Sequence, residues 1–182
     1  MPADLDPFTA SLLGKPEPEV KAALRVRLSN DFGMQEEVEG THLLEGVKVS
    51  VDFMLTAKPH LVAQGFTPEP VPLEVKQLSD QENKSIRAAW QCITYAQSSF
   101  SGTRPPFVIL YPQLSLFMKR GERCEHALTL SSLLPKANVA QLHFRRDGKW
   151  EIYFAQNRYF TEGKGVGPFA SILLKRYVGA WK

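Results

Sequence analysis

The sequence predicts an α/β fold in which a central mixed β-sheet is flanked by helices. Valines alternate with polar residues from 47 to 52, which is the period-2 pattern of a half-buried strand. Apolar residues recur at helical spacing from 16 to 29, and a continuous apolar run from 107 to 111 is typical of a buried strand. Because strand and helix patterns alternate along the chain, we expect them to share one layered core.

Length and composition restrict the class of protein. The 182 residues suit a single domain, which we place at 16–182 after a short N-terminal arm at 1–15. No apolar stretch is long enough to span a bilayer, and the N-terminus lacks the apolar core of a signal peptide, so we expect a cytoplasmic protein. Cys92 and Cys124 lack the Cys-x-x-Cys spacing of structural zinc and iron–sulfur sites. The net charge of +3 permits nucleic-acid binding but does not by itself indicate it.

The first predicted helix covers 16–29. Its two prolines fall in the first turn, where backbone N–H groups have no partner within the helix. Val20 and Leu24 mark its apolar face, and Glu17 shares that face, which is unusual for a carboxylate. The Asn-Asp-Phe-Gly sequence at 30–33 signals its end.

Two strands are predicted next, at 34–39 and 47–56, joined by a turn at 40–46. The valines of the second strand share one face, so Asp52 lies on the polar face. The following segment, 57–70, contains three prolines and predicts a long loop.

The next predicted strand, 71–78, contains Glu74, Val75 and Lys76. Successive side chains of a strand point to opposite faces. Glu74 and Lys76 therefore point the same way, while Val75 points back into the core.

A helix is predicted from Ser79 to about Phe100. Ser79 is its expected N-cap, and Glu82 completes a capping box three residues later. Its apolar faces are formed by Ile86, Ala89, Trp90, Ile93 and Ala96. After the buried strand at 107–111 we expect a strand or short helix at 126–134, a β-hairpin at 139–156 turning at Asp147-Gly148, a glycine-rich loop at 161–168 and a final amphipathic helix at 169–178.

Asp52, Glu74 and Lys76 form the candidate site. Two carboxylates on neighbouring strands can hold a divalent cation, because Mg²⁺ prefers oxygen ligands. A bound cation can lower the pKa of a water molecule and stabilise charge that develops on a phosphate. A plain Glu–Lys ion pair on a half-exposed strand is the alternative interpretation.

The Asp…Glu-x-Lys pattern resembles the PD-(D/E)XK nuclease superfamily, which has a restriction-endonuclease-like core. The order helix, strand, Asp-bearing strand, Glu-x-Lys strand, helix and buried strand is similar to that core over about 16–111. Gln91 and Tyr95 are four residues apart on the following helix and so share a face. This Gln-x-x-x-Tyr pattern is similar to that of the RecB-type branch. The chain departs from the usual pattern in the 21 residues between Asp52 and Glu74, a longer span than is common.

The resemblance implies a role for each matching residue of the two strands. Asp52 and Glu74 would bind Mg²⁺ or Mn²⁺, with the Val75 backbone carbonyl as a further ligand. Lys76 would orient or help deprotonate the attacking water and offset charge on the phosphate.

Residues of the flanking helices complete the implied site. Glu17 would be an accessory ligand or hold a water molecule, with Glu19 as its alternate. Gln91 and Tyr95 would contact the substrate backbone or support the site.

The expected function is metal-dependent hydrolysis of nucleic-acid phosphodiester bonds, with DNA as the preferred substrate. Nucleic acid is the expected partner and a membrane is not, while a homodimer or a partner protein stays open. Two alternatives remain. One is a non-catalytic nucleic-acid-binding or assembly subunit on the same fold, and the other is an unrelated α/β interaction domain in which Glu74 and Lys76 merely pair.

Overall fold

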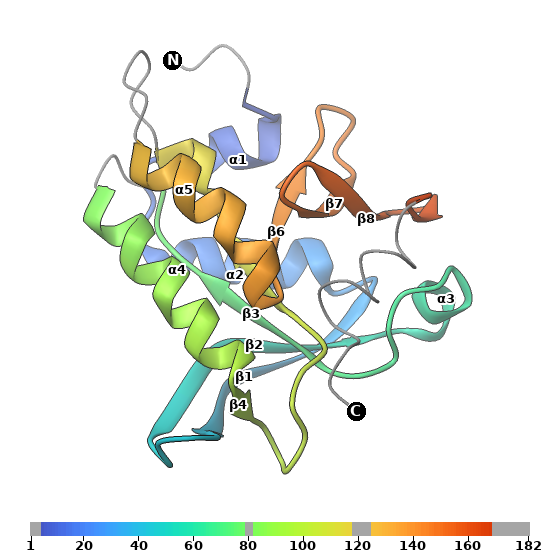
Figure 1. Cartoon of the computed structure of the whole chain (residues 1–182). Coiled ribbons are helices and arrows are strands. Elements are labelled where there is room, and N and C mark those ends of the chain that lie inside the picture. The colour runs from blue at the N-terminus through green and yellow to red at the C-terminus, as the bar shows by residue number, and fades with distance from the viewer. Residues whose placement is uncertain (1–4, 79–81, 118–124, 169–182) are drawn as a thin grey trace.

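The computed structural model describes residues 5–78, 82–117 and 125–168, and its strands form one mixed sheet (Figure 1). The strands are β1 Phe32–His42, β2 Lys48–Ala57, β3 Val71–Val75, β4 Ser98–Ser99, β5 Val108–Tyr111, β6 Val139–Phe144, β7 Trp150–Phe154, β8 Asn157–Thr161 and β9 Gly165–Val166. Their order across the described sheet is β4-β1-β2-β3-β5-β6-β7-β8-β9. Strands β3, β5 and β6 run parallel, and the other neighbours are antiparallel. The predicted α/β class with a mixed sheet is confirmed.

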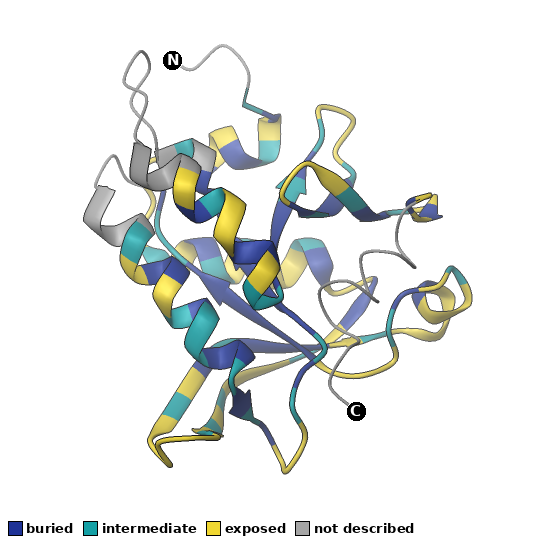
Figure 2. Cartoon of the chain, in the orientation of Figure 1, coloured by how far each residue is buried: buried dark blue, intermediate teal, exposed yellow. Residues whose placement is uncertain are grey.

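Helices lie on both faces of this sheet. They are α1 Pro7–Ser11, α2 Glu17–Leu28, α3 Pro59–Ala63, α4 Glu82–Ala96 and α5 Glu125–Leu133, with short 3₁₀ turns η1 Leu114–Phe117 and η2 Leu134–Ala137. One apolar cluster joins α4 and α5 to β5, and a second joins α2 to β2, β3 and the aromatic residues of β7 and β8. The central strands are accordingly buried on both faces (Figure 2).

Helix α2 confirms the first predicted helix. Val20 and Leu24 are fully buried, as the helical spacing predicts. A fully buried leucine contributes roughly 2 kcal/mol of hydrophobic free energy. The helix begins with proline in its first turn and ends at Leu28, just before the expected stop signal. One face of α2 is thereby held against the sheet beside β3.

Strand β1 is longer than the predicted 34–39. Its ladder with β2 runs from the Phe32–Ala57 pair to the Thr41–Lys48 pair. Of the extra residues, Phe32 is buried in the core and two are glycines, so the added ends do not continue the alternating pattern that marks a half-buried strand. Pairing with β2 along the strand, and with β4 at Thr41 and His42, holds them extended.

Other parts of the prediction between residues 57 and 100 were wrong as well. The expected loop at 57–70 contains helix α3, whose Leu61 is buried in the core. Strand β3 ends at Val75 rather than at residue 78, and the helix expected to reach residue 100 ends at Ala96. In each case the end depends on a packing or pairing partner distant in sequence.

Trp90 was predicted to lie on an apolar face of α4, but 60 % of its surface is exposed. The other predicted apolar residues do pack against the core, where Ala89 and Ala96 are buried together with Ala88, Cys92 and Tyr95. Trp90 therefore lies outside the buried face of α4, which packs against β5.

The remaining comparisons concern the N-terminal arm and the part of the chain after residue 117. Part of the expected N-terminal arm forms α1, which Asp6 caps and whose Thr9 lies within hydrogen-bonding distance of Tyr111. The glycine-rich segment at 161–168 contains β9, which pairs with β8. The segment at 126–134 is helical, and the β6–β7 hairpin is confirmed. Neither the predicted Ser79 cap nor the predicted helix at 169–178 falls within the described residues. Among the described helices, none has the length and apolar character needed to cross a membrane.

Candidate functional site

The site lies where β2 and β3 separate. Their ladder ends at the Phe53–Leu73 pair, so the next pair in register would be Asp52 and Glu74. That pair is not formed. Instead, the Val75 N–H donates a hydrogen bond of 2.7 Å to Oδ2 of Asp52. The carboxylate therefore satisfies a backbone donor that has no partner on β2.

Glu74 is the most deeply buried acid of the site, with 2 % of its side chain exposed. Leu73 and Val75 pack toward α2, so Glu74 points to the opposite face, toward α4. Its carboxyl shares a hydrogen bond with that of Asp52, and its Oε1 lies 2.5 Å from Nζ of Lys76. Burial, reinforced by the charge of Asp52, raises the pKa of Glu74 to about 7 although Lys76 opposes the shift.

Lys76 lies on the same side as Glu74, as strand alternation predicts. Burial alone would lower the pKa of Lys76, but Glu74 and, more weakly, Glu17 raise it above its ordinary value. Lys76 is therefore an ammonium group in this arrangement. Such a group can orient a water molecule and neutralise phosphate charge, but it cannot accept a proton.

Helix α2 contributes a lysine that the sequence patterns did not single out. Nζ of Lys21 lies 2.5 Å from Oδ1 of Asp52, 3.5 Å from Oε1 of Glu37 and 3.8 Å from Oε1 of Glu17. The available signal was its position four residues after Glu17, which places both on one helix face. Glu19, the alternate to Glu17, pairs instead with Lys15 at the surface, at 3.1 Å. Of the two glutamates, only Glu17 is thus directed toward the acids.

Helix α4 covers the site from the other face of the sheet. Tyr95 lies close to Glu74, and burial together with the nearby charge of Glu74 raises the pKa of Tyr95. Cys92, one turn earlier, is completely buried, and burial raises the pKa of its thiol well above the usual value. Cys92 is therefore a neutral packing residue next to the acids.

Gln91 is half-buried on the same helix. Its Oε1 is buried and accepts no hydrogen bond from the part of the chain that the structure describes. The structure thus brings Tyr95 close to Glu74, whereas Gln91 forms no hydrogen bond with Glu74 or Lys76, all three being described residues. The predicted substrate-binding role of Gln91 stays a prediction.

The donor chemistry suits a hydrated cation better than an all-protein cage. Within residues 5–78, 82–117 and 125–168, no three His, Cys, Asp or Glu side chains are grouped as metal ligands. Mg²⁺, however, usually keeps several waters and takes only one or two carboxylates. Asp52 and Glu74 provide these two, and the Lys21 ammonium already lies against Asp52 as a cation would.

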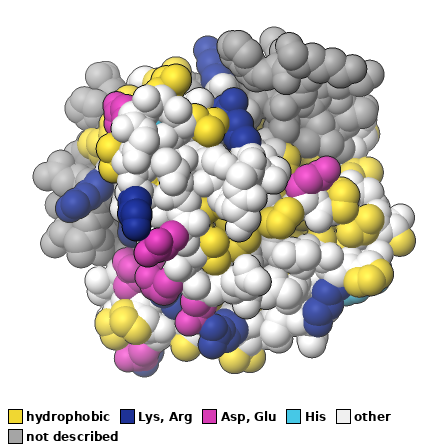
Figure 3. All heavy atoms as spheres, turned by 90° about the horizontal axis from the view of Figure 1, so that it is seen from below, with side chains coloured by type: hydrophobic (Ala, Val, Ile, Leu, Met, Phe, Trp, Pro, Cys, Tyr) yellow, Lys and Arg dark blue, Asp and Glu magenta, His cyan; other side chains and the backbone are white. Residues whose placement is uncertain are grey.

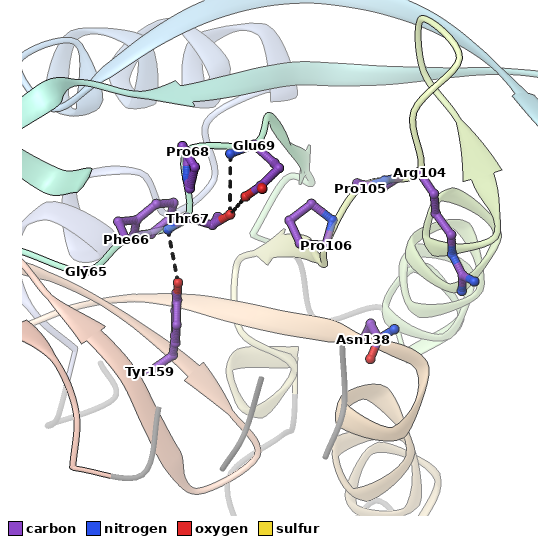
Figure 4. A pocket seen from close by; sticks show the side chains of 10 residues that line it. All are labelled: Gly65, Phe66, Thr67, Pro68, Glu69, Arg104, Pro105, Pro106, Asn138 and Tyr159. Carbon is purple, nitrogen blue, oxygen red and sulfur yellow. Dashed lines mark hydrogen bonds between the residues drawn. The ribbon is translucent and has the colours of Figure 1, made fainter. Parts of the chain in front are cut away.

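A separate hollow of about 520 Å³ lies away from the acids (Figure 4). Its lining includes Glu69 just before β3 and Pro106 just before β5, so it lies at the amino ends of these parallel strands. Glu74 and Lys76 lie at the carboxyl end of β3. None of the predicted site residues lines this hollow. The candidate chemistry and this cavity are therefore distinct features.

The molecular surface seen from below carries acidic side chains mixed with lysine and arginine (Figure 3). Among the described residues of that view, the basic groups form no continuous stripe. Comparisons with family models, with curated proteins and with solved structures found no match to this chain.

Proposed function

We propose that this protein is a metal-dependent nuclease that hydrolyses phosphodiester bonds, with DNA as its substrate. The observation that carries the proposal is the contact of Asp52, Glu74 and Lys76 across the separation of β2 and β3. A pair of neighbouring carboxyl groups with an ammonium group 2.5 Å from one of them offers metal ligands and a positive charge, both of which can assist phosphodiester hydrolysis.

The arrangement of elements supports a restriction-endonuclease-like core of the PD-(D/E)XK type. The order α2, β1, β2, β3, α4 and β5 follows the order expected from the resemblance, with α3 inserted before β3. The inserted helix accommodates the long span between Asp52 and Glu74.

In this proposal Asp52, Glu74 and the Val75 carbonyl would hold Mg²⁺ or Mn²⁺. The chemistry supplied by such a cation would be a lowered pKa of a bound water molecule and compensation of charge on the phosphate. Lys76 orients that water through its charge rather than by accepting its proton, because its pKa is raised. Glu17 holds a water molecule on the α2 side.

The α4 residues act on the opposite side of the site. Tyr95 lies near Glu74 and would orient its carboxylate through the phenol hydroxyl. Gln91, whose buried amide oxygen has no partner within the described parts of the chain, has hydrogen-bonding capacity left for a substrate. This pair is the basis for the RecB-type part of the proposal.

One observation favours a second candidate, a non-catalytic nucleic-acid-binding or assembly subunit on the same fold. The carboxylates of Asp52 and Glu74 are already contacted by Lys21 and Lys76, which forms a closed ion-pair network. Such a network can hold the sheet together without any cation. In both cases we place the protein in the cytoplasm, acting alone, as a homodimer or with a partner protein.

The deciding experiment incubates purified protein with linear, circular and single-stranded DNA and with RNA, in Mg²⁺, Mn²⁺ or EDTA. We expect cleavage that EDTA abolishes, and a loss of at least about a hundredfold in rate with Lys76→Ala. Lys48→Ala, which removes a lysine 84 % exposed on β2, is the matched control and should cleave normally. Metal binding without cleavage of any substrate would support the non-catalytic candidate instead.

A further inference from the structure

We propose that Lys21 occupies the cation position on Asp52 when no metal is bound, and that it sets the affinity of the site by competing with the metal. This inference rests on the proposed metal site. It concerns Lys21, a residue of α2 that lies outside the Asp…Glu-x-Lys pattern.

The contacts of Asp52 carry the first step. One carboxylate oxygen, Oδ2, already accepts a hydrogen bond from the Val75 N–H, so Oδ1 is the oxygen that the backbone leaves open to an incoming cation. The ammonium of Lys21 lies 2.5 Å from that oxygen, closer than its other two acidic neighbours. A cation that binds Oδ1 must therefore displace this ammonium group.

Lys21 has somewhere to go when it is displaced. Glu37 and Glu17 lie 3.5 and 3.8 Å from the same nitrogen, so a small rotation of the flexible lysine side chain exchanges Asp52 for either glutamate. Both glutamates are more exposed than Asp52, and 71 % of the Glu37 side chain is accessible. The movement therefore brings the ammonium toward solvent and needs no rearrangement of α2.

The charge of the cluster is consistent with this exchange. Glu17, Glu37, Asp52 and Glu74 face two ammonium groups, Lys21 and Lys76, so the fully ionised cluster has a net charge of −2. One divalent cation balances that charge while both lysines remain. If Lys21 instead remained on Asp52, the cation would bind within a few ångströms of an ammonium group and would be repelled.

Calorimetric titration with Mn²⁺ tests the inference directly. We expect Lys21→Met to bind Mn²⁺ about tenfold or more tightly than the wild type, because it removes the competing charge but keeps the aliphatic stem. Lys15→Met is the matched control. Lys15 lies just before α2 and pairs with Glu19 at the surface, away from Asp52. This variant should leave the affinity unchanged. Equal or weaker Mn²⁺ binding by Lys21→Met would overturn the inference.

A second measurement uses the wild-type protein and does not depend on how a variant folds. Lysine acylation is followed residue by residue by mass spectrometry, with and without Mn²⁺. Displacement from Asp52 should speed acylation of Lys21 severalfold, while Lys15 reacts at the same rate in both conditions. Unchanged protection of Lys21 at saturating Mn²⁺ would show that the metal does not displace it.

The outcomes separate this inference from the proposed function. Suppose that Asp52→Asn abolishes Mn²⁺ binding but Lys21→Met does not tighten it. The proposed metal site would then stand, and the competition by Lys21 would be refuted. Absence of Mn²⁺ binding in the wild type and in Lys21→Met alike would refute both.

Discussion

Asp52 accepts the hydrogen bond of the Val75 N–H at 2.7 Å, one position beyond the last paired residues of β2 and β3. A side chain here replaces a backbone carbonyl as the partner of a strand donor. The two strands can therefore separate without leaving that N–H unsatisfied. The separation lets Lys21 of α2 and Tyr95 of α4, from helices on opposite faces, reach acids of the same site.

The Asp52 carboxylate should combine a structural and a metal-binding role that two substitutions separate. Asp52→Asn keeps an oxygen acceptor for Val75, whereas Asp52→Ala leaves the buried N–H without a partner, which costs roughly 1–3 kcal/mol. Urea denaturation should find the alanine variant less stable than the asparagine variant by about that amount. Both should lose Mn²⁺ binding. Equal stabilities would show that solvent replaces the side chain at Val75.

Stability of the metal-free protein should depend on the protonation of Glu74. Its pKa is raised from 4.5 to about 7 in the folded state, so the folded protein holds a proton that the unfolded chain releases between these values. The contribution of Glu74 is fully present below pH 4.5 and falls by roughly 3 kcal/mol as pH rises to 7. Glu74→Gln removes this dependence.

The measurement is the difference in free energy of unfolding between Glu74→Gln and the wild type across this pH range. The difference is needed because burial lowers the pKa of His143 to about 4, which stabilises the protein in the opposite direction as pH rises. Glu74→Gln should gain stability relative to the wild type from pH 4.5 to 7. A constant difference would contradict the raised pKa.

Two glutamates of the first turn of α2 should differ in their effect on hydrolysis. Glu17 contacts Lys21 beside Asp52, whereas Glu19 pairs with Lys15 and is 55 % exposed. Glu17→Gln should lower the rate of DNA cleavage by about tenfold or more, because it removes a charge that positions water or metal. Glu19→Gln makes the same change of side chain at a position away from the site, so this variant should cleave at the wild-type rate. If both variants are slowed equally, the effect comes from the helix end and not from the site.

Gln91 should show opposite effects on stability and on binding. Its buried oxygen has no partner among the described residues, and such an acceptor costs roughly 1–3 kcal/mol. Gln91→Met should therefore stabilise the fold in thermal unfolding while it weakens nucleic-acid binding at fixed salt. Mn²⁺ affinity should stay unchanged, since an amide is a poor Mg²⁺ or Mn²⁺ ligand.

The same substitution at Gln35, which is exposed on β1, provides the control. Gln35→Met should alter neither stability nor binding. Unaltered nucleic-acid affinity of Gln91→Met would remove the RecB-type assignment but would leave the roles of Asp52, Glu74 and Lys76 open to test.

The sequence by itself determined the order of the main elements and the shared direction of Glu74 and Lys76. Both follow from local geometry, because the period of 2 in a strand and of 3.6 in a helix is a property of the backbone. Val20 and Leu24 are buried, and the Asp147-Gly148 hairpin forms, for the same local reason. Tertiary structure alone decided the contact of Lys21 with Asp52, the burial of Glu74 and the exposure of Trp90. These depend on where β2 and β3 separate and on which side of α4 meets the sheet, and such long-range pairings leave no periodic signal in the chain.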